Sequence, residues 1–259
     1  MGDHDRGQID TSAAEVYDSL FVPALFGRFS ARVLEVADPH AGEDVVDVAC
    51  GTGALTHLLR ERTSGRVVGV DLNPAMLEVA GRRGPDIDWI EADAAALPFD
   101  DGAFGLATCQ FGLMFFPEPA LCLAEMARVA RGGTLAVWDV IDRSPGYLAM
   151  RELFRDELGD EAASSLDAPF ALGAPGILED LVQSAGIERP GFVSIDGTGC
   201  FASIAQWVTT EVRGWTLGAS VDDDRLADLI AVADERLAEF ASDGGAVFGI
   251  AARVAHWPT

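Results

Sequence analysis

Three carboxylates occur in succession in the N-terminal half of the chain, at Asp47, Asp71 and Asp93. The first opens the segment DVACGTG (47–53), where glycines let the backbone approach a ligand without a Cβ clash. An acidic residue about twenty positions further on, here Asp71, can accept hydrogen bonds from both hydroxyls of a ribose. This spacing predicts a nucleoside-binding turn between a strand and a helix.

Two details of the turn argue against a dinucleotide as the ligand. The dinucleotide fingerprint needs a third glycine three residues after the second, but Gly53 is followed by Ala54, Leu55 and Thr56. A carboxylate at position 47 would also repel a pyrophosphate, whereas it suits an ammonium group. A ligand that joins a nucleoside to an amino acid, as S-adenosylmethionine does, is therefore favoured over NAD and a nicotinamide-dependent oxidoreductase.

Composition excludes several other classes of chemistry. The 18 basic residues are all arginine, so no lysine can form a Schiff base or bind phosphate in a phosphate loop. The formal net charge of −24 would repel a polyanion, which makes DNA and RNA poor substrates. The four cysteines and four histidines are scattered without zinc-ligand spacing, so we expect neither a bound metal nor a disulfide.

The elements that must position these residues alternate between strand and helix. Short apolar runs typical of buried strands occupy 44–49, 66–70, 87–91, 104–109 and 134–140. A helix is predicted at 119–129, ended by Gly132-Gly133, and another is opened by Asn73-Pro74. Such alternation predicts an α/β fold with a doubly wound, seven-stranded, mostly parallel Rossmann-like sheet.

The remaining segments are expected to cover this core. Residues 1–40 begin with a polar leader (1–10) and continue as two short helices, at 13–20 and 24–37, which form an N-terminal cap. The core itself takes residues 41–200 and 244–259, and residues 201–243 form a helical insertion that contributes to the substrate cap. Further helices are expected at 146–159 and 176–185, and strands at 191–196 and 247–255. With no apolar run of membrane-spanning length and no signal sequence, the chain is expected to be cytoplasmic, as a monomer or homodimer.

Three motifs together resemble those of class I S-adenosylmethionine-dependent methyltransferases. They are VVDVACGTGAL, VVGVDLNPAML and IEADAAALPFDDGAFGLATCQFGLMFFPEP. The most similar subgroup contains the ubiquinone/menaquinone C-methyltransferases (methyltransferase type 11-like). The resemblance covers about residues 45–140, and a looser similarity extends over the C-terminal half.

The resemblance implies a set of residues that bind S-adenosylmethionine and its product S-adenosylhomocysteine. Asp47 and the backbone of 49–53 would hold the methionine part, Asp71 the ribose, and Asp93 the adenine amino group. The full set is Tyr17, Asp47, Ala49, Cys50, Gly51, Gly53, Asp71, Leu72, Met76, Asp93, Ala94 and Gln110. Ala49 departs from the motif, which usually has glycine there, and we expect the extra methyl group to be tolerated.

The sequence indicates fewer residues for binding the methyl acceptor than for binding the cofactor. Methyl transfer from a sulfonium depends mainly on alignment and exclusion of water, which favours an apolar, aromatic pocket. The aromatic candidates are Phe21, Phe26, Phe111, Phe115 and Trp138. A general base is not evident; Tyr147, His256 and Asp139 are candidates by position only, and His57 is expected at the surface.

The sequence therefore predicts an enzyme that transfers a methyl group to C or O of a small hydrophobic or aromatic acceptor, a reaction that fits secondary metabolism. Two alternatives stay open: a cofactor-binding protein of the same fold that catalyses a non-methylating reaction, and a methyltransferase acting on protein or RNA. The negative charge disfavours the last of these.

Overall fold

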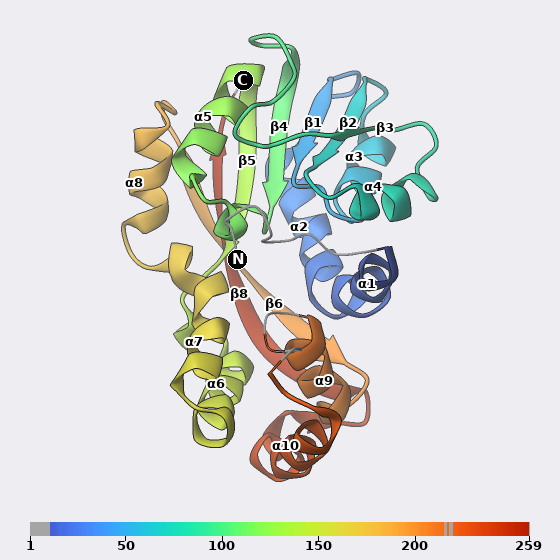
Figure 1. Cartoon of the computed structure of the whole chain (residues 1–259). Coiled ribbons are helices and arrows are strands. Elements are labelled where there is room, and N and C mark those ends of the chain that lie inside the picture. The colour runs from blue at the N-terminus through green and yellow to red at the C-terminus, as the bar shows by residue number, and fades with distance from the viewer. Residues whose placement is uncertain (1–10, 215–216, 218–219, 259) are drawn as a thin grey trace.

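A single mixed β-sheet forms the centre of the molecule, in a computed structural model that describes residues 11–214, 217 and 220–258 (Figure 1). The strand order is β3-β2-β1-β4-β5-β8-β6, and the short strand β7 pairs with β8. The first five strands are parallel, and β8 is antiparallel to both β5 and β6. The strands are β1 (Val45–Val48), β2 (Val67–Asp71), β3 (Asp88–Glu91), β4 (Phe104–Gln110), β5 (Ala130–Trp138), β6 (Gly191–Phe201), β7 (Ala241–Ser242) and β8 (Gly245–Trp257). The doubly wound, mostly parallel α/β sheet is thus confirmed, with β7 added to the seven strands expected.

Helices cover both faces of the sheet, which explains why its central strands are mostly apolar. All four residues of β1 are buried, including Asp47. Side chains of α2 and α3 join one core cluster, and those of α5 and α8 join the other. The covering helices are α2 (Gly27–Ala37), α3 (Thr56–Arg62), α4 (Pro74–Gly81), α5 (Pro119–Val129) and α8 (Ile177–Ser184).

The start of β5 differs from the prediction. Gly132 and Gly133 do not form the turn after α5; they lie inside β5, paired with Leu106 and Ala107 of β4. The reason is a close approach from β8, because a Cβ on Gly133 would lie 2.0 Å from the Trp257 ring. Gly133 makes room for this indole, and α5 ends instead where Ala130 becomes extended.

A second group of helices lies beyond the carboxyl ends of the parallel strands (Figure 1). It comprises α1 (Thr11–Val16), η2 (Tyr17–Phe26), α6 (Pro145–Leu158), α7 (Asp160–Asp167), α9 (Ile204–Gly214) and α10 (Asp223–Arg236). Short 3₁₀ segments connect several elements: η3 (Leu113–Phe115), η4 (Ile141–Arg143), η5 (Ala168–Gly173) and η7 (Ala238–Phe240). Within the ranges that the structure describes, no helix is long and apolar enough to cross a membrane.

The N-terminal helices differ from the two short, separate helices predicted. From Thr11 to Ala37 the chain is helical without a break, because the middle segment η2 adopts the wider π-helical form and contains Pro23. The predicted leader, residues 1–10, lies outside the described residues. This continuous helix runs over the carboxyl end of β1 and so forms one wall of the site.

Candidate functional site

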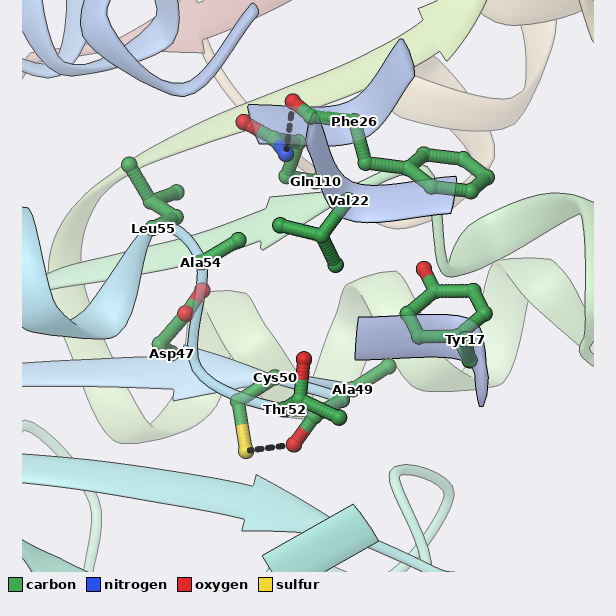
Figure 2. Close-up of a pocket in the computed structure, with 11 residues that line it drawn as sticks. Tyr17, Val22, Phe26, Asp47, Ala49, Cys50, Thr52, Ala54, Leu55 and Gln110 are labelled. Atoms are coloured by element: carbon green, nitrogen blue, oxygen red, sulfur yellow. Dashed lines mark hydrogen bonds between the residues drawn. The ribbon is translucent and has the colours of Figure 1, made fainter. Parts of the chain in front are cut away.

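A pocket lies where β1 ends and the glycine turn begins, directly below η2 (Figure 2). It unites segments that are far apart in sequence: η2, the turn after β1, and the end of β4. Its lining residues are Tyr17, Val22, Phe26, Asp47, Ala49, Cys50, Gly51, Thr52, Ala54, Leu55 and Gln110. Six of the twelve residues predicted to bind the cofactor are in this group.

Asp47 is the most deeply buried carboxylate of the pocket, with 1% of its surface exposed. Its two oxygens accept hydrogen bonds from Thr56 Oγ1 at 2.6 Å and Thr108 Oγ1 at 2.7 Å. Burial raises the pKa of Asp47 from 3.8 to about 6, against the lowering effect of the two hydroxyls. An ionised Asp47 is therefore costly by itself, and a cationic ligand would offset that cost.

Asp71 lies at the end of β2 and shapes the turn from the neighbouring strand. Its carboxylate accepts hydrogen bonds from the backbone N–H groups of Gly51 at 2.8 Å and Asn73 at 2.9 Å. Burial raises its pKa, and its charge in turn raises the pKa of Asp47. Neither carboxylate has an ion-pair partner among the described residues. Their negative charges would therefore attract a positively charged ligand to this edge of the pocket.

Ala49 occupies a conformation that favours glycine. Its φ is +54°, and its methyl group points to Gly112, where a Cβ would lie 2.6 Å away. A left-handed alanine costs about 1 kcal/mol or more relative to glycine. The methyl group is thus accommodated by a glycine at position 112, at the expense of backbone strain beside the ligand site.

Gln110, at the end of β4, connects the sheet to the helix above the pocket. Its Nε2 donates to the backbone carbonyl of Phe26 at 3.1 Å, which fixes the last turn of η2 (Figure 2). Two buried acceptors that belong to pocket residues, Gln110 Oε1 and Thr52 Oγ1, have no hydrogen-bond partner within the described part of the chain. Buried polar atoms of this kind are usually satisfied, so they indicate that a polar ligand completes the site.

The aromatic side chains of η2 form the upper wall. Tyr17 stacks on Phe26 with ring centroids 5.4 Å apart, and Cε1 of Tyr17 lies 4.0 Å from where a Cβ on Gly51 would be. Phe26 in turn packs on Trp138, which stacks on Phe111 at 3.8 Å. Five of the predicted aromatic residues thus form a continuous apolar cluster beside the carboxylates: Tyr17, Phe21, Phe26, Phe111 and Trp138. Phe115 is instead 40% exposed.

Other residues of the predicted set lie around this pocket but do not line it. Leu72 is 46% exposed, and Met76 packs against Ala14 and Val79 between α1 and α4. Asp93 is exposed and accepts from Ala95 N at 2.9 Å, with Ala94 buried behind it. They follow the carboxyl ends of β2 and β3, next to Asp71, which is where an extended nucleoside would continue from the pocket.

His57 is not the surface residue that was expected. It is half-buried, with its ring edge against Trp89 at 5.6 Å, and its Nε2 has no described hydrogen-bond partner. Burial and the charge of Arg83 lower its pKa. Gly53 has φ +84°, and a Cβ there would lie 2.8 Å from Trp89, so this glycine accommodates the Trp89–His57 pair behind the turn.

The three candidate bases are not brought to the pocket. The phenol of Tyr147 is buried and donates to Glu211 Oε1 at 2.6 Å, which joins α6 to α9. Asp139 accepts from Arg143 at 2.5 Å and from the N–H of Val140. His256 lies in β8, which is separated from β1 by β4 and β5. None of them lines the pocket, and among the described residues no group of three or more His, Cys, Asp or Glu could hold a metal.

Two residues that sequence reasoning missed are Thr56 and Thr108, the hydroxyl donors to Asp47. Thr108 is the direct neighbour of Asp47 in the parallel pairing of β1 with β4, and Thr56 begins α3. Their signal was present as polar residues within otherwise apolar segments. Recognising it required the strand register, which the sequence does not contain.

Comparisons with known proteins agree with this geometry. Residues 46–137 match the family described as a methyltransferase domain, which confirms the resemblance that the motifs indicated. The demethylmenaquinone methyltransferase of Thermus thermophilus is 42% identical over 130 residues, covering 47% of this chain and 59% of that protein. The 2-phytyl-1,4-naphtoquinone methyltransferase of Synechococcus elongatus is 31% identical over 153 residues, covering 55% of this chain and 65% of that protein. The chain therefore spans less than two thirds of the length of these relatives.

Among solved structures, a similar fold is found in a phosphoethanolamine N-methyltransferase 2 of Haemonchus contortus in complex with S-adenosyl-L-methionine. It is 15% identical, with a TM-score of 0.63, and the match covers 100% of this chain and 60% of that chain. At 15% identity, this similarity shows a shared fold and no more.

Proposed function

We propose that this chain is an S-adenosylmethionine-dependent methyltransferase that methylates C or O of a small hydrophobic or aromatic acceptor. The observation that carries the proposal is the pairing of the buried Asp47 with the partly buried Asp71, two carboxylates of raised pKa beside the glycine turn. A ligand with an ammonium or sulfonium charge relieves both, whereas a pyrophosphate would add charges of the same sign.

The residues present fit this cofactor. The two unpartnered acceptors, Gln110 Oε1 and Thr52 Oγ1, match the donors of an amino acid ammonium group, together with Asp47. Asp71 is at the strand end where the ribose hydroxyls would donate, and Asp93 follows the next strand. When bound, the cofactor supplies a methyl group on a positively charged sulfur.

In this proposal the chain itself contributes alignment, exclusion of water and an apolar wall. Tyr17 and Phe26 close the pocket from η2, and Gln110 fixes that helix to β4. Aromatic faces attract a sulfonium, and their low polarity favours a reaction in which positive charge disperses. No general base is assigned, which suits an acceptor whose reacting group is already acidic.

The acceptor is inferred from the wall and from the relatives. Phe26, Phe111 and Trp138 present an aromatic cluster next to the pocket. The named relatives are methyltransferases of demethylmenaquinone and of 2-phytyl-1,4-naphtoquinone, so we infer a hydrophobic ring compound as acceptor. We further propose a cytoplasmic protein that is monomeric or homodimeric. Its net charge of −24 supports the proposal that it does not bind nucleic acid.

Titration calorimetry with S-adenosylmethionine, S-adenosylhomocysteine and NAD tests the proposal. We expect binding of both sulfur ligands and none of NAD, and tight NAD binding alone would refute the proposal. Asp71→Ala should weaken the binding of S-adenosylhomocysteine more than tenfold, because a charge-assisted hydrogen bond to the ribose is lost. An unchanged dissociation constant would remove Asp71 from the site.

A further inference from the structure

The connection between β3 and β4 is unusual for a parallel sheet. β3 ends at the carboxyl edge and β4 begins at the opposite edge, so residues 92–103 must run the length of the sheet. They contain neither helix nor strand, yet Ala94 and Leu97 are buried. Backbone groups in such a segment must find partners other than a regular ladder.

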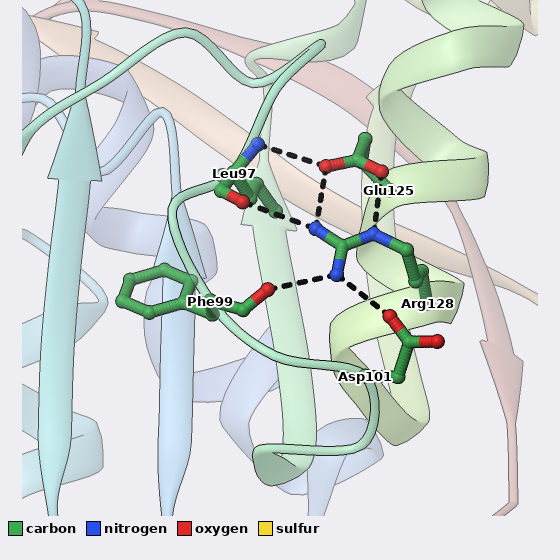
Figure 3. Close-up of polar contacts among 5 residues, drawn as sticks. All are labelled: Leu97, Phe99, Asp101, Glu125 and Arg128. Carbon is green, nitrogen blue, oxygen red and sulfur yellow. Dashed lines mark hydrogen bonds and ion pairs between the residues drawn. The ribbon is translucent and has the colours of Figure 1, made fainter.

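Arg128 of α5 supplies many of these partners (Figure 3). Its guanidinium donates to the carbonyl of Leu97 at 3.0 Å, the carbonyl of Phe99 at 2.7 Å, and Asp101 Oδ1 at 2.9 Å. Its remaining donors form a bidentate pair with Glu125, at 2.7 and 2.8 Å. The planar guanidinium thereby uses all five N–H groups, a geometry that lysine cannot reproduce.

Glu125 completes the arrangement by accepting from Leu97 N at 2.8 Å, so Leu97 is held at both its N–H and its carbonyl. We name Arg128 and Glu125 together the α5 clamp. The opposite end of the segment is also fixed, since Ala92 N donates to the carbonyl of Asp71 at 3.1 Å. Between these two attachments lies a tight turn in which Ala96 N donates to the carbonyl of Asp93 at 3.0 Å.

We propose that the α5 clamp is a positioning element for the nucleobase end of the cofactor site, an inference that rests on the proposed function. The clamp fixes Leu97, which ends the turn that holds Asp93 and Ala94. Within the described part of the chain, the Asp93 carboxylate accepts one hydrogen bond, from Ala95 N in the same turn. Its orientation toward an adenine therefore depends on the attachment of the turn at Leu97. At the methionine end, Asp47 is held by Thr56 and Thr108, neither of which belongs to the clamp.

The decisive variant is Arg128→Lys, which keeps the charge but removes the planar fork. We expect S-adenosylhomocysteine and adenosine to bind about tenfold more weakly, because the turn must be ordered on binding. We also expect faster amide exchange at residues 93–99 in the free protein. Once an acceptor is known, KM for the cofactor should rise while kcat at saturation stays unchanged.

Arg253→Gln is the matched control. Arg253 forms a comparable ion pair with Glu179 between β8 and α8, away from the pocket. Arg253→Gln should lower the melting temperature. It should leave the affinity for adenosine within twofold of wild type and the rate of amide exchange at residues 93–99 unchanged. If Arg128→Lys is too unstable to purify, Glu125→Gln keeps the shape of the clamp, loses the charge pair, and should show a smaller shift of the same kind.

Equal effects of Arg128→Lys and Arg253→Gln on adenosine affinity would overturn the inference, as would wild-type exchange at 93–99 in Arg128→Lys. The exchange measurement needs no ligand, so it tests the clamp independently of the cofactor. If the wild-type chain binds neither adenosine nor S-adenosylhomocysteine, the proposed function itself fails, and the inference fails with it.

Discussion

Replacing Asp47 with asparagine should make the protein more stable and less able to bind its cofactor. Burial raises the Asp47 pKa from 3.8 to about 6, a difference of about two units. At 1.36 kcal/mol per unit, the ionised carboxylate destabilises the fold at pH 7 by about 3 kcal/mol. Asparagine removes this cost, but one of the hydroxyls of Thr56 and Thr108 must then accept instead of donate, at about 1 kcal/mol.

The net gain is about 2 kcal/mol, which corresponds to a rise in melting temperature of roughly 4–8 °C for a chain of this size. The sign follows from the direction of the pKa shift. Because the folded-state pKa is raised, the group lowers wild-type stability as pH rises from about 4 to about 6. The advantage of Asp47→Asn should therefore be full at pH 7 and vanish near pH 4.

Ligand binding should change in the opposite direction. Loss of a charge-assisted hydrogen bond to an ammonium group costs about 1.5–3 kcal/mol, or roughly 10- to 100-fold in affinity for S-adenosylhomocysteine. Wild-type affinity should fall below about pH 6, where Asp47 becomes protonated, and this dependence should be absent from the variant. Thermal unfolding from pH 4 to 8 and calorimetry measure both effects.

Asp44→Asn is the control, because Asp44 is exposed at the opposite end of β1, where its carboxylate accepts from Arg66 N. It should leave the affinity unchanged. The reasoning would be refuted if Asp47→Asn melted below wild type at pH 7, or if it bound S-adenosylhomocysteine as tightly as wild type.

Two further variants test the backbone and the cap. Ala49→Gly should stabilise the protein by about 1 kcal/mol in urea unfolding, since φ is +54° there; Ala54→Gly, in the same turn without a positive φ, should destabilise it. If both substitutions changed the free energy of unfolding in the same direction, the backbone strain assigned to Ala49 would be contradicted. Tyr147→Phe should cost about 1.5–3 kcal/mol of stability by removing the hydrogen bond to Glu211, with cofactor affinity within twofold because the pair lies outside the pocket. A loss of affinity without a loss of stability would instead place Tyr147 in the site.

The sequence by itself determined the strand–helix alternation and the residue types that suit a methyl-donor cofactor. Apolar runs bounded by glycine and proline are local signals, so the predicted strands fall within a few residues of those observed, and α5 spans Pro119–Val129 as predicted. The carboxylates at successive strand ends are also local, because a strand that enters a buried parallel sheet leaves it at its carboxyl edge.

Only the tertiary structure decided which groups meet. Thr108 reaches Asp47 through strand register, Gln110 reaches Phe26 across 84 residues, and Gly133 is explained by Trp257 of β8. These pairs join segments whose separation leaves no periodic trace in the sequence. The same holds for the α5 clamp. In the sequence, Arg128 is a basic residue near the end of a predicted helix. Its contacts form because the segment 92–103, which has no regular structure, passes within reach of its guanidinium.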